Sequence, residues 1–214
     1  MYAKFFKRLI DFVLSFIALI VLSPVLLILT IIGAIVMKGN PFFIQKRPGM
    51  INKKTGQERI ISLVKFRTMT NAKDSQGSLL PDEVRLVPYG KFLRSTSLDE
   101  LPSLVNIVIG DTAICGPRPL LVAYLPRYSP EQRRRHEVRP GLTGYAQAYG
   151  RNTLTWQEKF EKDIYYVEHV SLWLDIKILF KTVSVVLKRE GITSETSVTM
   201  EEFMGNESEE QVNV

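Results

Sequence analysis

Residues 12–37 read FVLSFIALIVLSPVLLILTIIGAIVM, a run of 26 residues that carries no charge. An apolar run longer than about 18 residues is typical of a segment embedded in a membrane. A removable signal peptide has a shorter apolar region that ends in a small-x-small cleavage site, and neither feature is found here. The sequence therefore predicts that residues 1–37 form a retained membrane helix.

Ser23 and Pro24 lie near the middle of this run. Proline lacks the amide hydrogen of a helix residue and clashes with the preceding turn, so a bend or break is expected there. The serine hydroxyl can donate to a backbone carbonyl that the proline leaves free, which matters inside lipid because no water is available. Ser23-Pro24 is thus the predicted break of the membrane helix.

Basic residues flank the run on both sides. They are Lys4, Lys7 and Arg8 before it and Lys38, Lys46 and Arg47 after it. Positive charge favours the cytoplasmic side, so both flanks satisfy this rule if the chain enters and leaves by the same face. Each arm would be about 16–20 Å long, which reaches the middle of a ~30 Å bilayer core. These features favour a re-entrant helix–break–helix; a kinked spanning helix remains the alternative.

The rest of the chain divides by charge. Residues 38–194 hold 25 Lys and Arg against 15 Asp and Glu, which predicts a folded domain on the cytoplasmic face. Residues 195–214 hold six Glu and no Lys or Arg, which predicts an acidic, disordered tail. No nucleic-acid motif accompanies the positive charge, so it is expected to meet anionic lipid or phosphorylated ligands and no nucleic acid.

Residue patterns predict a fold that is mainly α with a small β-hairpin (α+β). Two short strands are expected at 41–45 and 60–66, with a turn at 54–56 and a loop at 71–81. Helices are expected at 131–137, 155–170 and 171–190. The last has a wide apolar face with Trp173 and several lysines, so it is either an interfacial amphipathic helix or a core helix.

Asp163 lies in the predicted helix 155–170 on the same face as Trp156, Phe160 and Val167. A carboxylate is almost never buried without a partner. Asp163 is therefore expected either to pair with an arginine from another element or to form part of an active-site wall.

Residues 94–104 read RSTSLDELPSL. Ser97 and Glu100 have the spacing of a capping box, which would begin a helix that runs to about Ile109. In this interpretation Asp99 and Glu100 only cap a helix.

A chemical interpretation starts from the residues around this pair. Arg94 precedes it, Arg118 follows in GPRP at 116–119, and Lys65 and Arg67 come from the predicted strand. An ionised aspartate can attack phosphorus and form an acyl phosphate. Because nucleophile and phosphate are both anions, the attack needs a metal ion and arginines nearby.

Residues 139–147 read RPGLTGYAQ, a glycine-containing loop. Glycines permit close backbone approach to a phosphate or nucleotide. An ordinary turn is the alternative.

Six segments, taken in order, resemble the bacterial sugar transferases, the monotopic phosphoglycosyl transferases. They are the apolar run with Ser23-Pro24, QKRPG at 45–49, KFRTM at 65–69, RSTSLDELP at 94–102, GPRP at 116–119 and RPGLTG at 139–144. The resemblance covers residues 1 to about 191 and is to the small, minimal catalytic form of the family.

The resemblance implies a reaction at the cytoplasmic face of the bacterial inner membrane. A sugar 1-phosphate would pass from a UDP-sugar, N-acetylated or diacetamido, to undecaprenyl phosphate in the lipid bilayer, with release of UMP. It also implies that the membrane helix is re-entrant and that residues 38–194 are the catalytic domain.

The resemblance assigns roles to individual residues. Asp99 would be the nucleophile that carries the phosphosugar, and Asp99 and Glu100 would hold Mg²⁺. The residues expected to bind substrate or phosphate, or to support that site, are Lys65, Arg67, Arg94, Arg118, Arg139, Gly141, Thr143, Gly144, Gln147 and Asp163. Two other function classes stay open: a catalytically silent membrane-anchored assembly protein of a glycan pathway, and a peripheral lipid-binding module.

Overall fold

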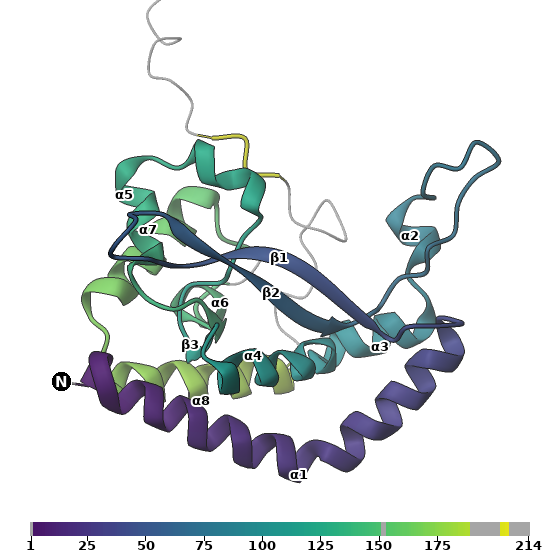
Figure 1. The fold of residues 1–214 in the computed structure, drawn as a ribbon, viewed down its shortest axis with the longest axis horizontal. Helices are drawn as coiled ribbons and strands as arrows, with labels where there is room; N and C mark the ends of the chain where they lie inside the picture. Colours follow the sequence, from purple (N-terminus) through teal and green to yellow (C-terminus); the bar gives the residue numbers. More distant parts are fainter. Residues whose placement is uncertain (1, 151–152, 189–201, 206–214) are drawn as a thin grey trace, which may run out of the picture.

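The computed structural model describes residues 2–150, 153–188 and 202–205. After a short π-helical turn, Tyr2–Phe6, the chain forms one long helix, α1 (Lys7–Val36). Figure 1 shows that α1 is a wide V beneath the other elements, with both of its ends close to them. The predicted N-terminal helix is therefore present, and the remaining elements lie on one side of it.

Ser23-Pro24 bends α1 without ending it. Proline at position 24 cannot donate to the carbonyl of Ile20, four residues earlier. The Ser23 hydroxyl donates to that carbonyl instead, over 2.8 Å. The expected break is thus a bend within one continuous helix, and serine satisfies the carbonyl that proline leaves free.

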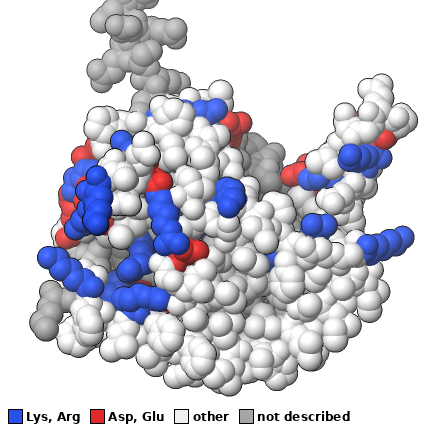
Figure 2. Space-filling model, in the orientation of Figure 1, with Lys and Arg blue, Asp and Glu red and all other residues white. Residues whose placement is uncertain are grey.

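The outer surface of α1 is apolar and exposed. Only 11% of its most apolar 18-residue stretch is buried, and the side chains of Val21, Leu27 and Ile35 are each more than 60% exposed. In Figure 2 the lower face of the molecule is almost free of charge, and Lys and Arg gather above it. Water is a poor solvent for such a surface, so the helix needs an apolar environment.

A twisted hairpin crosses above α1. Strands β1 (Phe42–Ile51) and β2 (Glu58–Phe66) pair antiparallel, which confirms both predicted strands and lengthens them. Phe42 and Phe66 stack at the open end of the hairpin, where Phe66 packs against Leu29 of α1 and Leu93. This cluster joins the second arm of α1 to the hairpin.

The segment after the hairpin contains α2 (Asp82–Arg85), α3 (Pro88–Thr96), the 3₁₀ helix η2 (Leu98–Ser103) and α4 (Leu104–Ile109). The predicted capping box is wrong. Ser97 adopts a left-handed conformation (φ 58°) that ends α3, and its side chain caps nothing. A left-handed residue is a common helix stop, and it turns the chain so that Asp99 and Glu100 start a new element.

The remaining elements assemble over α4. Strands β3 (Ala113–Cys115) and β4 (Gly141–Thr143) form a short parallel pair that the sequence did not predict. The predicted helix at 131–137 is α5 (Pro130–Arg133) followed by η4 (Arg134–Glu137). The other elements are η3 (Val122–Arg127), α6 (Tyr145–Ala148), α7 (Trp156–Glu168) and α8 (Leu172–Lys188). The predictions for 155–170 and 171–190 are confirmed within about two residues.

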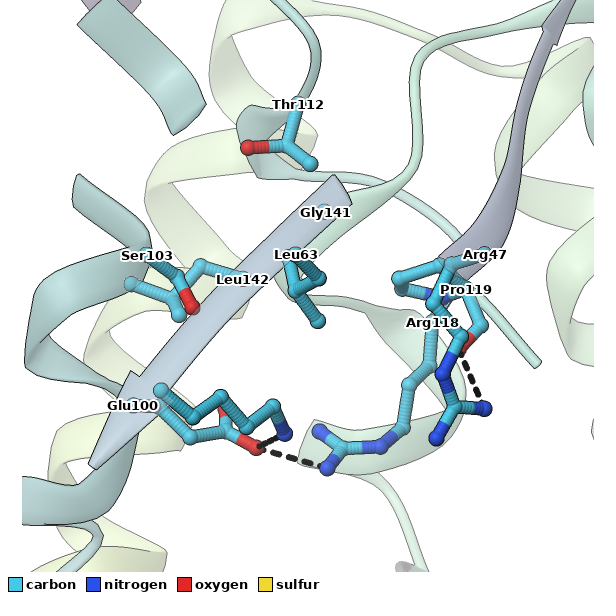
Figure 3. A pocket seen from close by; sticks show the side chains of 10 residues that line it. Arg47, Leu63, Glu100, Ser103, Thr112, Arg118, Pro119, Gly141 and Leu142 are labelled. Atoms are coloured by element: carbon cyan, nitrogen blue, oxygen red, sulfur yellow. Dashed lines mark hydrogen bonds and ion pairs between the residues drawn. The ribbon is translucent and has the colours of Figure 1, made fainter. Parts of the chain in front are cut away.

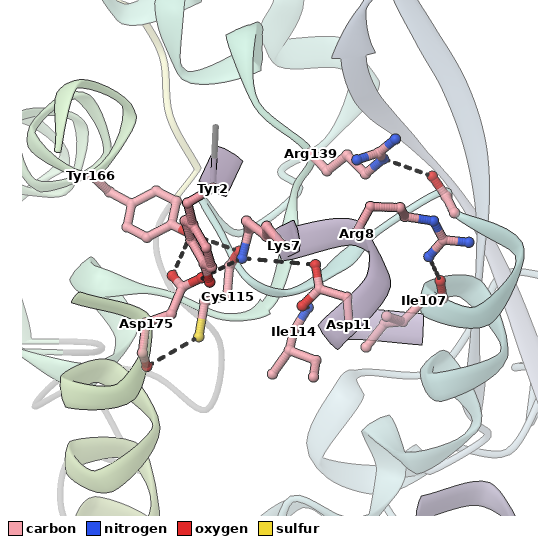
Figure 4. A network of polar contacts seen from close by, with 11 residues as sticks. Tyr2, Lys7, Arg8, Asp11, Ile107, Ile114, Cys115, Arg139, Tyr166 and Asp175 are labelled. Atoms are coloured by element: carbon pink, nitrogen blue, oxygen red, sulfur yellow. Dashed lines mark hydrogen bonds and ion pairs between the residues drawn. The ribbon is translucent and has the colours of Figure 1, made fainter. Parts of the chain in front are cut away.

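A buried polar network holds the start of α1 to the rest of the molecule (Figure 4). Asp175 of α8 accepts from the Lys7 ammonium at 2.7 Å and from the Tyr166 hydroxyl at 2.7 Å. Asp11 accepts from the backbone N–H of Ile114, over 3.2 Å. Buried charges need such partners, and these partners come from α1, β3, α7 and α8. The first arm of α1 therefore has a defined position under the molecule.

Part of the predicted tail packs against the domain. Phe203 is buried among the rings of Tyr124, Tyr128, Trp156 and Phe160. Residues 195–201 and 206–214 of the predicted tail lie outside the described residues.

Asp163 forms a structural ion pair, one of its two expected roles. Its Oδ2 accepts from Nη2 of Arg135 at 2.6 Å and from Nε at 3.0 Å, and both side chains are buried. Burial raises the pKa of Asp163, while the Arg135 charge opposes that rise. The pair joins α7 to η4.

Substitution of Asp163 by asparagine is expected to lower the free energy of unfolding by about 3–5 kcal/mol, because Arg135 would keep a buried charge without a counter-charge. Glu168→Gln is the matched control on the same helix. It breaks the exposed pair with Arg134 and is expected to leave the free energy of unfolding almost unchanged, because solvent screens that pair. Thermal unfolding in detergent compares the two; equal losses would contradict the assignment.

Candidate active site

Two carboxylates, Asp99 and Glu100, begin the 3₁₀ helix η2, and hydrogen bonds to β2 hold that helix in place. The Ser103 hydroxyl donates to the Val64 carbonyl at 2.7 Å. The Asn106 amide donates to the Ser62 carbonyl at 2.8 Å and accepts from the Val64 N–H at 3.1 Å. These buried polar side chains fix η2 and α4 to the backbone of the hairpin.

Glu100 lies between two cations from distant segments. Its Oε1 accepts from Lys65 Nζ of β2 at 2.7 Å and from Arg118 Nη2 at 2.6 Å. Burial alone would raise the pKa of Glu100, but the Arg118 and Lys65 charges outweigh it and hold that pKa well below its usual range. Glu100 is therefore ionised at neutral pH.

Asp99 has a different environment. Burial and the neighbouring Glu100 charge raise its pKa to about 6, although Lys65, Arg118 and Arg94 oppose the rise. Among the described residues, no side chain or backbone group forms a hydrogen bond or ion pair with its carboxylate. Asp99 is thus mostly ionised at neutral pH and its oxygens are not engaged, as a nucleophile requires.

A pocket opens beside Glu100 (Figure 3). Its empty volume is about 370 Å³, including the open mouth. Side chains from β1, β2, η2 and the 116–119 segment line it together with β4: Arg47, Leu63, Lys65, Glu100, Ser103, Thr112, Arg118, Pro119, Gly141 and Leu142. The pocket combines a carboxylate with several cations, which suits an anionic ligand. Asp99 does not line it, but Asp99 is the chain neighbour of Glu100 and is close enough to Lys65 and Arg118 for their charges to lower its pKa.

The backbone around Arg118 is held from two sides. Buried Arg135 donates to the Arg118 carbonyl at 2.8 Å. Gly116 and Gly141 pack so closely that a Cβ on Gly141 would lie 2.2 Å from the Gly116 nitrogen. Larger residues cannot occupy such a contact, so the glycines of GPRP and GLTG bring two loops together at the pocket wall.

The structure brings together some predicted residues. Glu100 is in direct contact with Lys65 and Arg118, and Gly141 lines the same pocket. Arg94 lies near Asp99, and its Nε donates to the Thr68 hydroxyl at 3.1 Å.

Other predicted residues lie away from the pocket lining. Arg139 Nε donates to the Gly110 carbonyl at 3.2 Å, near α1 (Figure 4). Thr143 bonds Thr182 of α8 at 2.7 Å, and a Cβ on Gly144 would lie 2.2 Å from the Gly116 oxygen. Gln147 donates to the Leu142 carbonyl at 3.3 Å.

Two further predicted residues make other contacts. Arg67 donates its backbone N–H to the Pro41 carbonyl at 2.7 Å. Asp163 binds Arg135, and Arg135 in turn donates to the backbone carbonyl of Arg118, so Asp163 supports the pocket only indirectly.

Arg47 is a pocket residue that the residue-by-residue assignment missed. It belongs to QKRPG at 45–49, and the sequence interpretation of Arg47 was limited to the basic flank of the apolar run. The predicted strand ends at residue 45, so the strand alternation that places Lys46 on the exposed face of β1 and Arg47 on the other face did not reach Arg47.

The two adjacent carboxylates fit the magnesium ion that the resemblance implies. Mg²⁺ in proteins usually binds one or two carboxylates and completes its shell with water and phosphate oxygens. Among the described residues there is no cluster of three or more acidic, histidine or cysteine ligands. Asp99 and Glu100 are the residues that would hold the ion that the resemblance implies.

Comparison with known proteins gives a consistent result. The model of the family "Bacterial sugar transferase" matches residues 2–189. The chain is 48% identical over 201 residues to "Uncharacterized sugar transferase EpsL" of Bacillus subtilis, covering 94% of this chain and 96% of that protein.

Relatives with named activities are longer. The UDP-glucose:undecaprenyl-phosphate glucose-1-phosphate transferase of Klebsiella pneumoniae is 39% identical over 188 residues, covering 83% of this chain and 39% of that protein. The UDP-N-acetylgalactosamine-undecaprenyl-phosphate N-acetylgalactosaminephosphotransferase of Aeromonas hydrophila is 34% identical, covering 86% of this chain and 44% of that protein. The chain thus spans less than half of these relatives.

The match to the family model covers nearly the whole described chain, from α1 through the pocket to α8. The chain belongs to the bacterial sugar transferase family.

Proposed function

We propose that the protein transfers a sugar 1-phosphate from a UDP-sugar to undecaprenyl phosphate and releases UMP. The observation that carries this proposal is the contrast between the two carboxylates: Glu100 is bound by Lys65 and Arg118, while Asp99 beside it is ionised and not engaged. The named relatives are undecaprenyl-phosphate sugar phosphotransferases, which supports the same reaction here.

The proposed first step is attack by an Asp99 carboxylate oxygen on the phosphorus that bears the sugar. A bond forms between that oxygen and phosphorus, the bond from phosphorus to the bridging oxygen breaks, and its electron pair leaves with UMP. In the second step a phosphate oxygen of undecaprenyl phosphate attacks the same phosphorus. The acyl-phosphate bond then breaks and restores the Asp99 carboxylate.

Lys65 and Arg118 stabilise the charge that develops during both steps. They converge on Glu100, next to the proposed nucleophile, so their donors are already oriented before substrate binds. Mg²⁺ held by Asp99 and Glu100 would neutralise phosphate oxygens and so allow two anions to approach. Arg135 keeps Arg118 in place from behind.

We also propose that α1 is re-entrant and that the active site faces the cytoplasm. The bend at Pro24, the apolar surface of α1 and the proximity of both ends to the domain support this arrangement. Helix α8 exposes Trp173 (65%) and Phe180 (76%), so it would lie in the headgroup region while its other face packs on the domain. The reactive phosphates would then meet at the membrane surface.

Asp99→Asn is expected to abolish the covalent adduct and to lower UMP release by about 10³-fold or more, because the amide cannot attack phosphorus. Intact-protein mass spectrometry with a panel of UDP-sugars measures the adduct and identifies the donor, with N-acetylated and diacetamido sugars beside plain hexoses.

Asp74→Asn is the matched control, since it makes the same change on an exposed loop. UMP release that persists in Asp99→Asn would refute the nucleophile. A wild-type protein inactive with every donor and undecaprenyl phosphate would favour the silent assembly protein.

Chelation of divalent cations with EDTA is expected to slow adduct formation by at least about a hundredfold, and added Mg²⁺ should restore it. The melting temperature in EDTA is the control, and it should stay unchanged because the metal is not structural. Full adduct formation in EDTA would contradict the metal assignment.

Cysteines introduced at Lys4 and Asn40 are expected to react from the same side of the membrane, because both ends of a re-entrant helix stay on one face. Both positions are exposed, whereas native Cys115 is buried. An impermeant maleimide should label them only in opened cells, as it should label a cysteine at Ser75 in the exposed loop. Labelling of only one of the two in intact cells would show a spanning helix.

A further inference from the structure

Arg47 has an unbalanced charge within the pocket. Its Nη2 donates to the Gln45 side chain at 2.5 Å and its Nη1 approaches the Pro119 carbonyl at 3.4 Å. Both of these partners are neutral. Among the described residues no carboxylate pairs with it, and its buried Nε has no hydrogen-bond partner.

The pocket as a whole holds more positive than negative charge. Its lining contains Arg47, Lys65 and Arg118 but only the carboxylate of Glu100. Lys65 and Arg118 share the charge of Glu100, and even with Asp99 included the cations exceed the anions by one. The surplus lies on Arg47.

This arrangement is unfavourable without a ligand. Burial and repulsion from Arg118 lower the pKa of Arg47 to about 10. Figure 3 shows the Arg47 guanidinium beside that of Arg118, and a dashed line joins the Arg118 guanidinium to Glu100. An anion between the two guanidiniums would remove the repulsion and use the free Nε–H.

We propose that Arg47 binds a second phosphate, distinct from the one that Asp99 attacks. Lys65 and Arg118 bind Glu100, next to the proposed nucleophile, and so serve the attacked phosphorus, whereas Arg47 lies beside Arg118 and forms no ion pair with Glu100 among the described residues. The planar guanidinium can form two parallel bonds to phosphate oxygens. This inference rests on the proposed function for its substrates.

Two substrates of the proposed reaction present such a phosphate. One is the nucleotide phosphate that leaves as UMP, and the other is the headgroup of undecaprenyl phosphate. Released UMP and undecaprenyl phosphate are both phosphate monoesters, so separate measurements with UMP and with undecaprenyl phosphate must distinguish them.

The test compares Arg47→Gln and Arg47→Lys with wild type. Titration with UMP alone, followed by calorimetry, is expected to show a Kd at least about tenfold higher for Arg47→Gln. Arg47→Lys should lose less, because it keeps the charge but not the fork. Lys46→Gln is the matched control: it removes the neighbouring charge on the exposed face of β1 and should leave UMP binding unchanged.

A second measurement is the KM for undecaprenyl phosphate. A weaker UMP affinity assigns Arg47 to the nucleotide phosphate, and a raised KM with unchanged UMP affinity assigns it to the lipid phosphate. Either result supports the second phosphate site. If Arg47→Gln and Arg47→Lys both fold, by melting temperature, and change neither quantity, the inference is overturned.

UMP binding requires no turnover, so this inference and the proposed function can fail separately. Suppose that Arg47→Gln binds UMP more weakly than wild type but that the wild type itself forms no adduct. This result would refute the transferase mechanism and keep the phosphate site. Adduct formation by the wild type, together with unchanged UMP affinity and unchanged KM for undecaprenyl phosphate in the Arg47 variants, would keep the transferase mechanism and refute the phosphate site.

Discussion

The candidate site depends on one oxygen atom, Oε1 of Glu100, which accepts from Lys65 and Arg118. The three residues come from β2, η2 and the segment after β3, and they are separated by up to 53 positions in the chain. A buried carboxylate is stable only when paired. The need to neutralise Glu100 therefore brings these segments together, and it leaves Asp99 beside them ionised and without a competing partner.

A second constraint is the attachment of α1. Its first arm is held by the buried pair of Lys7 and Asp175, and its second arm by Leu29 in the cluster with Phe66. Because Phe66 follows Lys65 directly, the apolar helix is tied to the strand that carries a site residue. The distance from the site to the surface of α1 is thus set by rigid packing, which would fix the depth of the chemistry relative to lipid.

The sequence predicts the elements whose patterns are strong and local. The apolar run, the hairpin and the helices at 155–170 and 171–190 all follow from periodicity. The cost of burying a carboxylate left two roles for Asp163, and the structure shows the pairing with an arginine. The family motifs identify Lys65, Glu100 and Arg118, but spacing alone does not show that they touch.

Other features depend on tertiary contacts that no local pattern reveals. The left-handed Ser97 replaces the expected cap because the chain must turn there to place Glu100 against Lys65. The β3–β4 pair needs two glycine-containing loops to meet across more than twenty residues. Phe203 finds its aromatic partners only after α7 and η3 are assembled. These contacts join residues that are far apart in the sequence, and local secondary-structure propensity does not predict them.

The pair of Lys7 and Asp175 joins residues that are 168 positions apart. During synthesis the N-terminal segment emerges first, and at about 5–20 residues per second Asp175 follows many seconds later. The apolar helix can reach lipid in that interval, while Lys7 and Asp11 still lack the partners that cover them. The contact that docks the domain onto the first arm of α1 can therefore form only after Asp175 has been synthesised.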